Sequence, residues 1–217
     1  MKQNVLEKIT ALDVEIIVLD IDGTLKDLAS EHKETLSTVL NCFIKGKKTQ
    51  KRMICLVDKI AMWFVKAGIL PTNERMQRIL TTMYAIFLFE NISEFRKQYE
   101  FFYRKEIVIF DEMKQLLEEI SKAKDIYFVT INKQNYNLEE QGIASDKIIY
   151  TMSKKKVKAY KRLIEEKKLD KSKILIVGDN LFDDIKSAKK LGIKYLLVDN
   201  YDSKFKRFIA RILNVGM

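Results

Sequence analysis

The sequence predicts an α/β protein that combines a doubly wound, parallel sheet with an inserted helical bundle. Short apolar runs alternate with helical patterns over the second half of the chain, as they do in βαβ units. One further apolar run lies near the N-terminus, and a long region with only helical periodicity separates it from the others. The 217 residues are enough for one large domain or for one domain with an insertion.

Five apolar runs have the length of strands, and several are rich in Ile and Val, which is typical of buried parallel strands. These runs are Ile16–Leu19, Ile126–Val129, Lys147–Tyr150, Ile174–Val177 and Tyr195–Val198. The helical patterns that accompany the later runs are Glu112–Ala123, Lys155–Lys168 and Asp183–Leu191. This alternation predicts the doubly wound sheet.

The region between the first and second strands has long 3.6-residue periodicity and no convincing strand. Its predicted helices are Lys33–Ile44, Arg52–Lys66, Asn73–Phe89 and Ser93–Arg104. We therefore expect a helical domain at residues 26–105, inserted into a core formed by residues 1–25 and 106–217. The aromatic side chains of this region lie at helical spacing in apolar surroundings, so we expect them in the core of the bundle. They are Trp63, Phe64, Tyr84, Phe87, Phe89, Phe101 and Phe102.

The C-terminal segment Asp202–Leu213 has the pattern of an amphipathic helix. Its apolar face carries Phe205, Phe208, Ile209, Ile212 and Leu213, and its basic face carries Lys204, Lys206, Arg207 and Arg211. We expect a helix that docks on the sheet. The alternative is a basic amphipathic helix that binds a surface.

The composition is basic, with 40 Lys and Arg against 30 Asp and Glu and a formal net charge of +10. Between Lys26 and Lys105 there are 15 basic and 8 acidic residues, so most of the excess belongs to the helical region. A positive field attracts phosphorylated metabolites, nucleic acid or acidic membranes. We do not expect nucleic-acid binding, because no recognition motif accompanies the charge, and the pattern indicates no particular oligomeric state.

The cysteine and histidine content excludes a disulfide framework and a zinc cluster of the usual form, because the chain has two cysteines and only His32. We expect no signal peptide, since the first apolar run is short and ends in Asp20. The most apolar long segment, Ile54–Leu70, is too short and too charged to span a bilayer. The sequence therefore predicts a cytoplasmic protein without a transmembrane segment.

Two aspartates follow the first predicted strand, in the segment Asp20-Ile-Asp22-Gly23-Thr24. The carboxyl ends of strands are where ligands bind in open α/β sheets. Two carboxylates so close together are electrostatically costly unless a cation or a proton compensates them. The alternative is a turn at the end of the strand in which the aspartates only cap backbone groups.

A second acidic group, Gly178-Asp179-Asn180-Leu181-Phe182-Asp183-Asp184, follows the strand Ile174–Val177 and precedes a helix. Asp179 is therefore expected at the same edge of the sheet as Asp20. Carboxylates from two strand ends offer the hard oxygen ligands that Mg²⁺ prefers. For Asp183, capping of the helix or solvation is the favoured interpretation.

Two weaker signals lie between these acidic groups. Thr130 ends the strand Ile126–Val129, and its hydroxyl could bond a phosphoryl oxygen. Lysines open the next predicted helix at Lys154, Lys155, Lys156 and Lys158. One of them could neutralise phosphate, although a run of lysines is usually a solvated face.

Taken together, these four sites resemble the haloacid dehalogenase-like hydrolase superfamily, in the order that family shows. Its first motif, D-x-D-G-T, matches Asp20 to Thr24, and its fourth, G-D-x-x-x-x-D, matches Gly178, Asp179 and Asp184. Thr130 matches the second motif, and Lys154 best fits the spacing of the third, with Lys155 close behind and the assignment within Lys154–Lys156 open. The resemblance covers residues 12–25 and 106–200 and implies a Rossmann-like core, with the helical insertion as an α-helical cap.

The resemblance also implies a chemistry. Asp20 is expected to attack phosphorus and form an aspartyl-phosphate, and Asp22 to act as general acid and then general base. Mg²⁺ is expected on Asp20, Asp179, Asp184 and the backbone carbonyl of Asp22, while Thr130 and Lys154 hold the phosphate oxygens. Dehalogenases of the family lack the second aspartate, so Asp22 indicates phosphate chemistry on a small phosphorylated substrate.

The resemblance leaves three functions open. A phosphatase for a small phosphorylated metabolite is the first, a phosphomutase with the same nucleophile is the second, and a non-catalytic binding or scaffold protein on the same fold is the third. We expect the cap to select the substrate by closing over the site. The cap's densest basic cluster, Lys45, Lys47, Lys48, Lys51 and Arg52, is expected to be a solvated loop, and the alternative is a clamp on a second phosphate or a polyanion.

Overall fold

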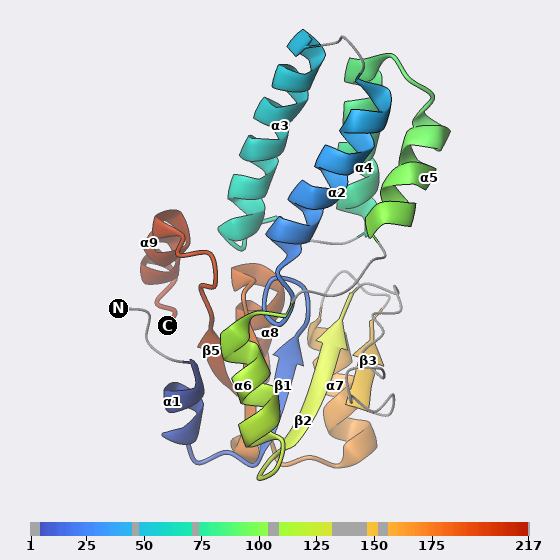
Figure 1. The fold of residues 1–217 in the computed structure, drawn as a ribbon. Coiled ribbons are helices and arrows are strands. Elements are labelled where there is room, and N and C mark those ends of the chain that lie inside the picture. The colour runs from blue at the N-terminus through green and yellow to red at the C-terminus, as the bar shows by residue number, and fades with distance from the viewer. Residues whose placement is uncertain are drawn as a thin grey trace.

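A computed structural model describes residues 5–44, 48–70, 74–103, 109–131, 147–151 and 156–216. Its centre is a sheet of five parallel strands in the order β3-β2-β1-β4-β5 (Figure 1). The strands are β1 (Ile16–Asp20), β2 (Asp125–Thr130), β3 (Ile148–Tyr150), β4 (Ile174–Gly178) and β5 (Lys194–Leu197). The predicted doubly wound sheet is confirmed, and each strand end lies within a residue or two of its predicted position.

Helices cover both faces of the sheet, because successive side chains of a strand point to opposite sides. Ile17 and Leu19 pack with α1 (Val5–Thr10) and α6 (Asp111–Ile120) on one face. Ile16 and Val18 pack with α7 (Val157–Lys167) and α8 (Lys186–Leu191) on the other. The central strand β1 therefore carries apolar residues at every position before Asp20, which is why its sequence is a continuous apolar run.

The helical insertion follows β1 and stands over the carboxyl ends of the strands (Figure 1). It contains α2 (Leu28–Phe43), α3 (Lys48–Lys66), α4 (Glu74–Leu88) and α5 (Ile92–Tyr103), after which α6 returns to the sheet. The first four helices bury a core of their own, built around Leu36, Val39, Leu40, Ile54, Tyr84, Phe95 and Tyr99. Asp27 caps the start of α2 by accepting a hydrogen bond from the Ser30 amide (3.1 Å).

A polar network lies inside the insertion. His32 on α2 contacts the hydroxyl of Tyr99 through Nδ1, and its Nε2 lies 2.5 Å from Asp58 Oδ1 on α3. The hydroxyl of Tyr84 on α4 donates to the same Asp58 oxygen at 2.8 Å. Burial, followed by the nearby Asp58 charge, raises the pKa of Tyr84. The Asp58 carboxylate of α3 is thus hydrogen-bonded to α2 through His32 and to α4 through Tyr84. Both partners are buried, so they depend on this carboxylate and not on water for a hydrogen bond.

The expectation that the aromatic residues of the insertion form its core is only partly correct. Tyr84 is buried, but Trp63, Phe89 and Phe101 are exposed. Phe89 has a positive φ of 56° just past the end of α4, a conformation that ends the helix and turns its side chain outward. When both sides of a helix carry large apolar side chains, their spacing in the sequence does not show which side faces the core and which faces solvent.

The C-terminal helix α9 (Lys204–Ile212) begins after Ser203, whose hydroxyl accepts a hydrogen bond from the Lys206 amide (3.1 Å). The expected docking of this helix on the core is confirmed, because Ala210 and the partly buried Ile209 pack with Leu197 of β5, but much of its predicted apolar face is exposed. Its fully buried residues are Lys206 and Ala210, whereas Phe208 and Ile212 are exposed. A charge partner in the core explains the buried lysine, as the site below shows.

In the described part of the chain, no helix is both long enough and apolar enough to cross a membrane. Helix α3 has 19 residues and many apolar side chains, but it also contains several charged ones.

We predict that Asp58→Ala destabilises the protein by roughly 2–3 kcal/mol, because it leaves the buried partners of the carboxylate without a hydrogen-bond acceptor. Urea unfolding followed by the fluorescence of Trp63, the single tryptophan and a residue of α3, measures the change. Exposed Glu119→Ala is the matched control. A loss for Asp58→Ala no larger than that of the control would show that the network does not stabilise the insertion.

Candidate functional site

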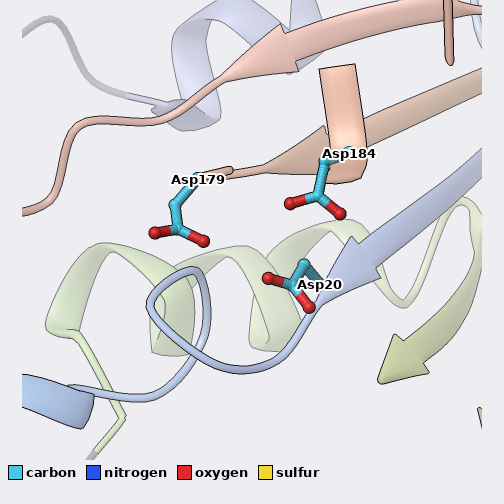
Figure 2. Close-up of side chains that lie close together, drawn as sticks. All are labelled: Asp20, Asp179 and Asp184. Carbon is cyan, nitrogen blue, oxygen red and sulfur yellow. The ribbon is translucent and has the colours of Figure 1, made fainter. Parts of the chain in front are cut away.

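Three aspartates meet at the carboxyl edge of the sheet. Asp20, Asp179 and Asp184 point toward one another (Figure 2), and one carboxylate oxygen from each lies within 4.8 Å of the others. Their side chains are almost fully buried. Because β1 and β4 are neighbours in the sheet, the chain brings the two acidic motifs of the sequence to one point.

The loop after β4 holds two of these acids in place. Asn180 accepts hydrogen bonds from the amides of Phe182 and Asp183, both at 2.9 Å, and so begins the helical turn Leu181–Ile185. Asp184 turns back from this turn and accepts from the Asn180 amide at 3.1 Å. Asn180 therefore caps this turn and Asp183 does not, while Asp183 is partly exposed and, as expected, is not one of the three clustered acids.

Two glycines are required where the acids pack against the backbone. A Cβ on Gly178 would lie 2.4 Å from Cγ of Asp184, which is closer than carbon atoms can approach. Gly23 has a φ of +84°, and a Cβ there would lie 2.6 Å from an Asp179 carboxylate oxygen. The Thr24 hydroxyl lies 3.4 Å from oxygens of both Asp20 and Asp179 and so bridges the two strand ends.

A buried lysine at the start of α7 binds two of the acids. Lys156 Nζ lies 2.5 Å from Asp20 Oδ1 and 2.7 Å from Asp184 Oδ1, and Tyr160 donates its hydroxyl to the same Asp184 oxygen at 2.8 Å. Burial alone would lower the pKa of Lys156, but the Asp184 and Asp20 carboxylates outweigh it and raise that pKa. Lys154, the best fit by spacing, lies outside the described residues.

A second buried lysine, which the sequence did not single out, reaches the site from α9. Lys206 is fully buried, and its Nζ lies 3.8 Å from Asp179 Oδ2. Within the described residues, this Nζ has no hydrogen-bond partner, so its stabilisation comes from the nearby carboxylate charge. In the sequence, Lys206 belongs to the basic face of an amphipathic pattern, which predicts an exposed side chain. The spacing of the residues therefore could not identify Lys206 as buried.

The remaining predicted site residues lie around this group. Asp22 is buried in the loop after β1 and contributes no carboxylate to the triad. It lies close enough to Tyr103, at the end of α5, that its charge adds to burial in raising the pKa of that phenol. Thr130 is fully buried at the end of β2, one position beyond the residue paired with Asp20.

The triad is poorly compensated by protein groups alone. Burial, and then the nearby Asp184 charge, raise the pKa of Asp20 well above its ordinary value, and burial also raises the pKa of Asp179. Three buried carboxylates with two lysines beside them leave an excess of negative charge in a region of low dielectric. A hard divalent cation with oxygen ligands, such as Mg²⁺, fits this donor set.

Comparison with known proteins supports the same assignment. The family model described as haloacid dehalogenase-like hydrolase matches residues 17–198. No curated protein gives a match. Among solved structures, the fold resembles YfnB from Bacillus subtilis, described as a HAD-hydrolase bound to magnesium, with a TM-score of 0.66 and 18% identity over 94% of this chain and 100% of that one.

Two structures described as phosphatases share the fold at similar distance. A predicted phosphoglycolate phosphatase from Haemophilus somnus has a TM-score of 0.61 and 14% identity over 93% of this chain and 99% of that one. A candidate phosphatase from Clostridium difficile has a TM-score of 0.58 and 20% identity over 89% of each chain. Since the family model covers most of the chain and both acidic motifs, this protein belongs to the haloacid dehalogenase-like hydrolases.

Proposed function

We propose that the protein is a Mg²⁺-dependent phosphatase that hydrolyses a small phosphorylated metabolite through an aspartyl-phosphate on Asp20. The observation that carries this proposal is the buried group of Asp20, Asp179 and Asp184, with Lys156 bonded to the first and the last. Bound magnesium would offset the repulsion between an anionic nucleophile and an anionic substrate. The magnesium in YfnB and the phosphatase descriptions of two similar folds also favour it.

Asp20 is the proposed nucleophile because it lies at the end of β1, where a carboxylate faces the space above the sheet edge. Attack by one of its oxygens forms a bond to phosphorus and releases the alcohol of the ester. Lys156 and Thr24 fix the orientation of the carboxylate by contacting different oxygens of it. Water then cleaves the acyl phosphate and restores Asp20.

Asp22 is the proposed general acid and base. It would protonate the leaving alcohol and then take a proton from the attacking water. Its place outside the acidic triad, beside Tyr103 of α5, supports this role, since a proton donor has to lie on the side of the leaving group. A halide leaving group needs no proton, and Asp22 therefore favours a phosphatase over a dehalogenase.

The phosphate oxygens need cationic and hydroxyl partners, because most of the charge in phosphoryl transfer resides on them. We propose Thr130 and one lysine of the Lys154–Lys156 run. Lys156 is the better candidate of the run, since it already lies at 2.5 Å from the nucleophile. We also propose residues 26–105 as the cap that selects the substrate, with Asp184 and the carbonyl of Asp22 completing the magnesium site.

The first test is phosphate release from an aryl phosphate and a panel of cellular phosphate esters, with Mg²⁺ and with a chelator. We predict release that depends on Mg²⁺ and falls by more than about a thousandfold in Asp20→Asn, which removes the nucleophile. A matched folding control is the circular dichroism spectrum of the variant.

Other outcomes of this assay point elsewhere. Near-normal activity of Asp20→Asn would overturn the nucleophile assignment. Transfer of phosphate between positions of one substrate, with little free phosphate, would indicate a mutase. Halide release from haloacids would indicate a dehalogenase, and a folded, inactive protein that still binds Mg²⁺ would indicate a scaffold.

The second test separates the candidate lysines. We predict that Lys156→Met lowers kcat/KM by at least about a hundredfold, because it removes both a charge beside the nucleophile and a phosphate partner. Lys154→Met, which changes the same residue type two positions away, should stay within about tenfold of wild type. The opposite ranking of the two variants would assign the phosphate contact to Lys154.

The third test uses the raised pKa values of Asp20 and Asp179. Since folding raises both pKa values above 3.8, the metal-free fold gains stability from their protonation. This contribution is complete below the ordinary carboxyl range and is lost as the pH rises through the raised values. In the presence of chelator, we therefore predict that the Tm of the wild type is higher at mildly acidic than at alkaline pH. This difference in Tm should be smaller in the variant Asp179→Asn.

Thermal unfolding of both proteins across this pH range, with and without Mg²⁺, provides the measurement. Bound cation should remove most of the difference at alkaline pH, because it competes with protons for the same oxygens. Identical pH profiles for wild type and Asp179→Asn in chelator would show that the triad is not the source of the excess charge.

A further inference from the structure

The outer face of α3 carries an apolar stripe that the described part of the structure leaves about half exposed. Met53, Leu56, Ile60 and Trp63 recur at intervals of three and four residues and therefore share one side of the helix. Each of them is about half exposed, and Leu56 reaches 60%. Single exposed apolar residues are common, but four in one row over three turns form a continuous surface.

A basic row runs beside this stripe. Arg52, Lys59 and Lys66 are spaced by seven residues, which places them in line along one edge of the apolar row. The only acidic residue of α3 is Asp58, and it points inward, where it accepts a hydrogen bond from Tyr84. The exposed side of α3 is thus apolar and positive, with no negative charge of its own.

The C-terminal helix α9 has the same arrangement. Its exposed apolar residues, Phe208 and Ile212, are bordered by the exposed Lys204 and Arg211, and the helix contains no acidic residue. Its buried side is held by Lys206 and Ala210 instead. A helix of nine residues therefore presents its most apolar side chains to the outside.

The two helices form one surface. The ring of Phe205 on α9 stacks on Trp63 of α3 with centroids 4.5 Å apart and an interplanar angle of 26°. Phe205 in turn stacks against Phe208. In Figure 1, α9 lies to the left of the lower end of α3. We call the exposed apolar and basic residues of these helices the α3–α9 face.

We propose that the α3–α9 face docks on the surface of an anionic lipid bilayer as a peripheral contact. Apolar side chains bordered by Lys and Arg match the two layers of such a surface, acyl chains below and negative headgroups above. Trp63 lies in the middle of the face, and tryptophan is enriched at the level of the headgroups.

Charge favours a bilayer over other occupants. A second copy of this chain would bring the basic rows of two faces together, so like charges would oppose pairing. The acid that lies beside Trp63, Lys66 and Lys204 is Asp202, and it is already paired with Arg207. A nucleic acid would account for the lysines and arginines but not for the row of exposed Leu, Ile and Met side chains. An anionic bilayer can contact both kinds of residue on the face, because its headgroups attract the Lys and Arg side chains and its acyl chains accept the apolar ones.

The proposal is independent of the catalytic chemistry. The residues of the face lie on the outside of α3 and α9, and none of them belongs to the acidic triad or contacts it directly. Variants on the face can therefore be tested for lipid binding by physical methods, whether or not the protein releases phosphate.

The test is co-sedimentation of the 217-residue chain with vesicles of phosphatidylcholine alone, and with vesicles in which about one third is phosphatidylglycerol. We expect binding to the anionic vesicles only, reduced by salt, with a blue shift in the fluorescence of Trp63, the single tryptophan. The double variants Leu56→Ser with Phe208→Ser, and Lys59→Glu with Lys204→Glu, should each weaken binding by more than about tenfold.

Matched controls lie elsewhere on the molecule. Phe101→Ser changes another exposed aromatic residue, and Lys122→Glu with Lys161→Glu reverses the same number of exposed charges on the core. These controls should bind like wild type, and circular dichroism melting establishes that all variants fold. Vesicle binding that is absent, or that the controls weaken as much as the face variants do, would overturn the proposal.

Two further outcomes would also overturn it. Self-association in analytical ultracentrifugation that Leu56→Ser with Phe208→Ser abolishes would assign the face to a second copy of the chain. Tight binding of a nucleic-acid oligomer that Lys59→Glu with Lys204→Glu abolishes, without vesicle binding, would assign it to nucleic acid.

Discussion

Mutual repulsion among three buried carboxylates is the constraint on which the rest of the site depends. Asp20, Asp179 and Asp184 occupy one point at the edge of the sheet, where water cannot screen their charges. Lys156 enters from α7 and Lys206 from α9, so two helices on opposite parts of the core are fixed by the charge of the site. The remaining negative charge makes a divalent cation favourable at a place where an isolated acid would simply be protonated.

Close approach is the second constraint, and it accounts for the positions of three glycines. Gly23 and Gly178 leave room for the carboxylates of Asp179 and Asp184. Gly68, at the end of α3, has a φ of +67°, and a Cβ there would lie 2.5 Å from the Asp179 carbonyl oxygen. Its own carbonyl accepts a hydrogen bond from the Leu181 amide at 3.2 Å. The insertion therefore touches the loop that carries Asp179, so the position of the helices and the position of this acid are coupled.

The sequence predicted the parts of the fold that depend on local patterns. Five buried parallel strands produce five apolar runs, and motifs at strand ends become neighbours once the strands pair, so Asp20 and Asp179 could be placed together before the structure was known. It could not predict which face of an amphipathic helix turns inward. On α9, the buried Lys206 faces the carboxylate of Asp179 in the loop after β4, and only the tertiary arrangement reveals that partner. The short helix α1 was also missed, because six residues carry too little periodicity.

The orientation of α9 follows from the charge of the site. Burying Phe208 and exposing Lys206 would satisfy the amphipathic pattern, yet the structure buries Lys206, 3.8 Å from Asp179. Such burial is stable only while the carboxylate compensates the lysine. A cation on the triad would compete with Lys206 for the charge of Asp179 and weaken the hold of the core on α9. Because such coupling is reciprocal, a partner on the outer face of α9 would alter the affinity of the triad for the cation only if it shifted Lys206 relative to Asp179. The buried lysine thus links the apolar face on the outside to the acids within.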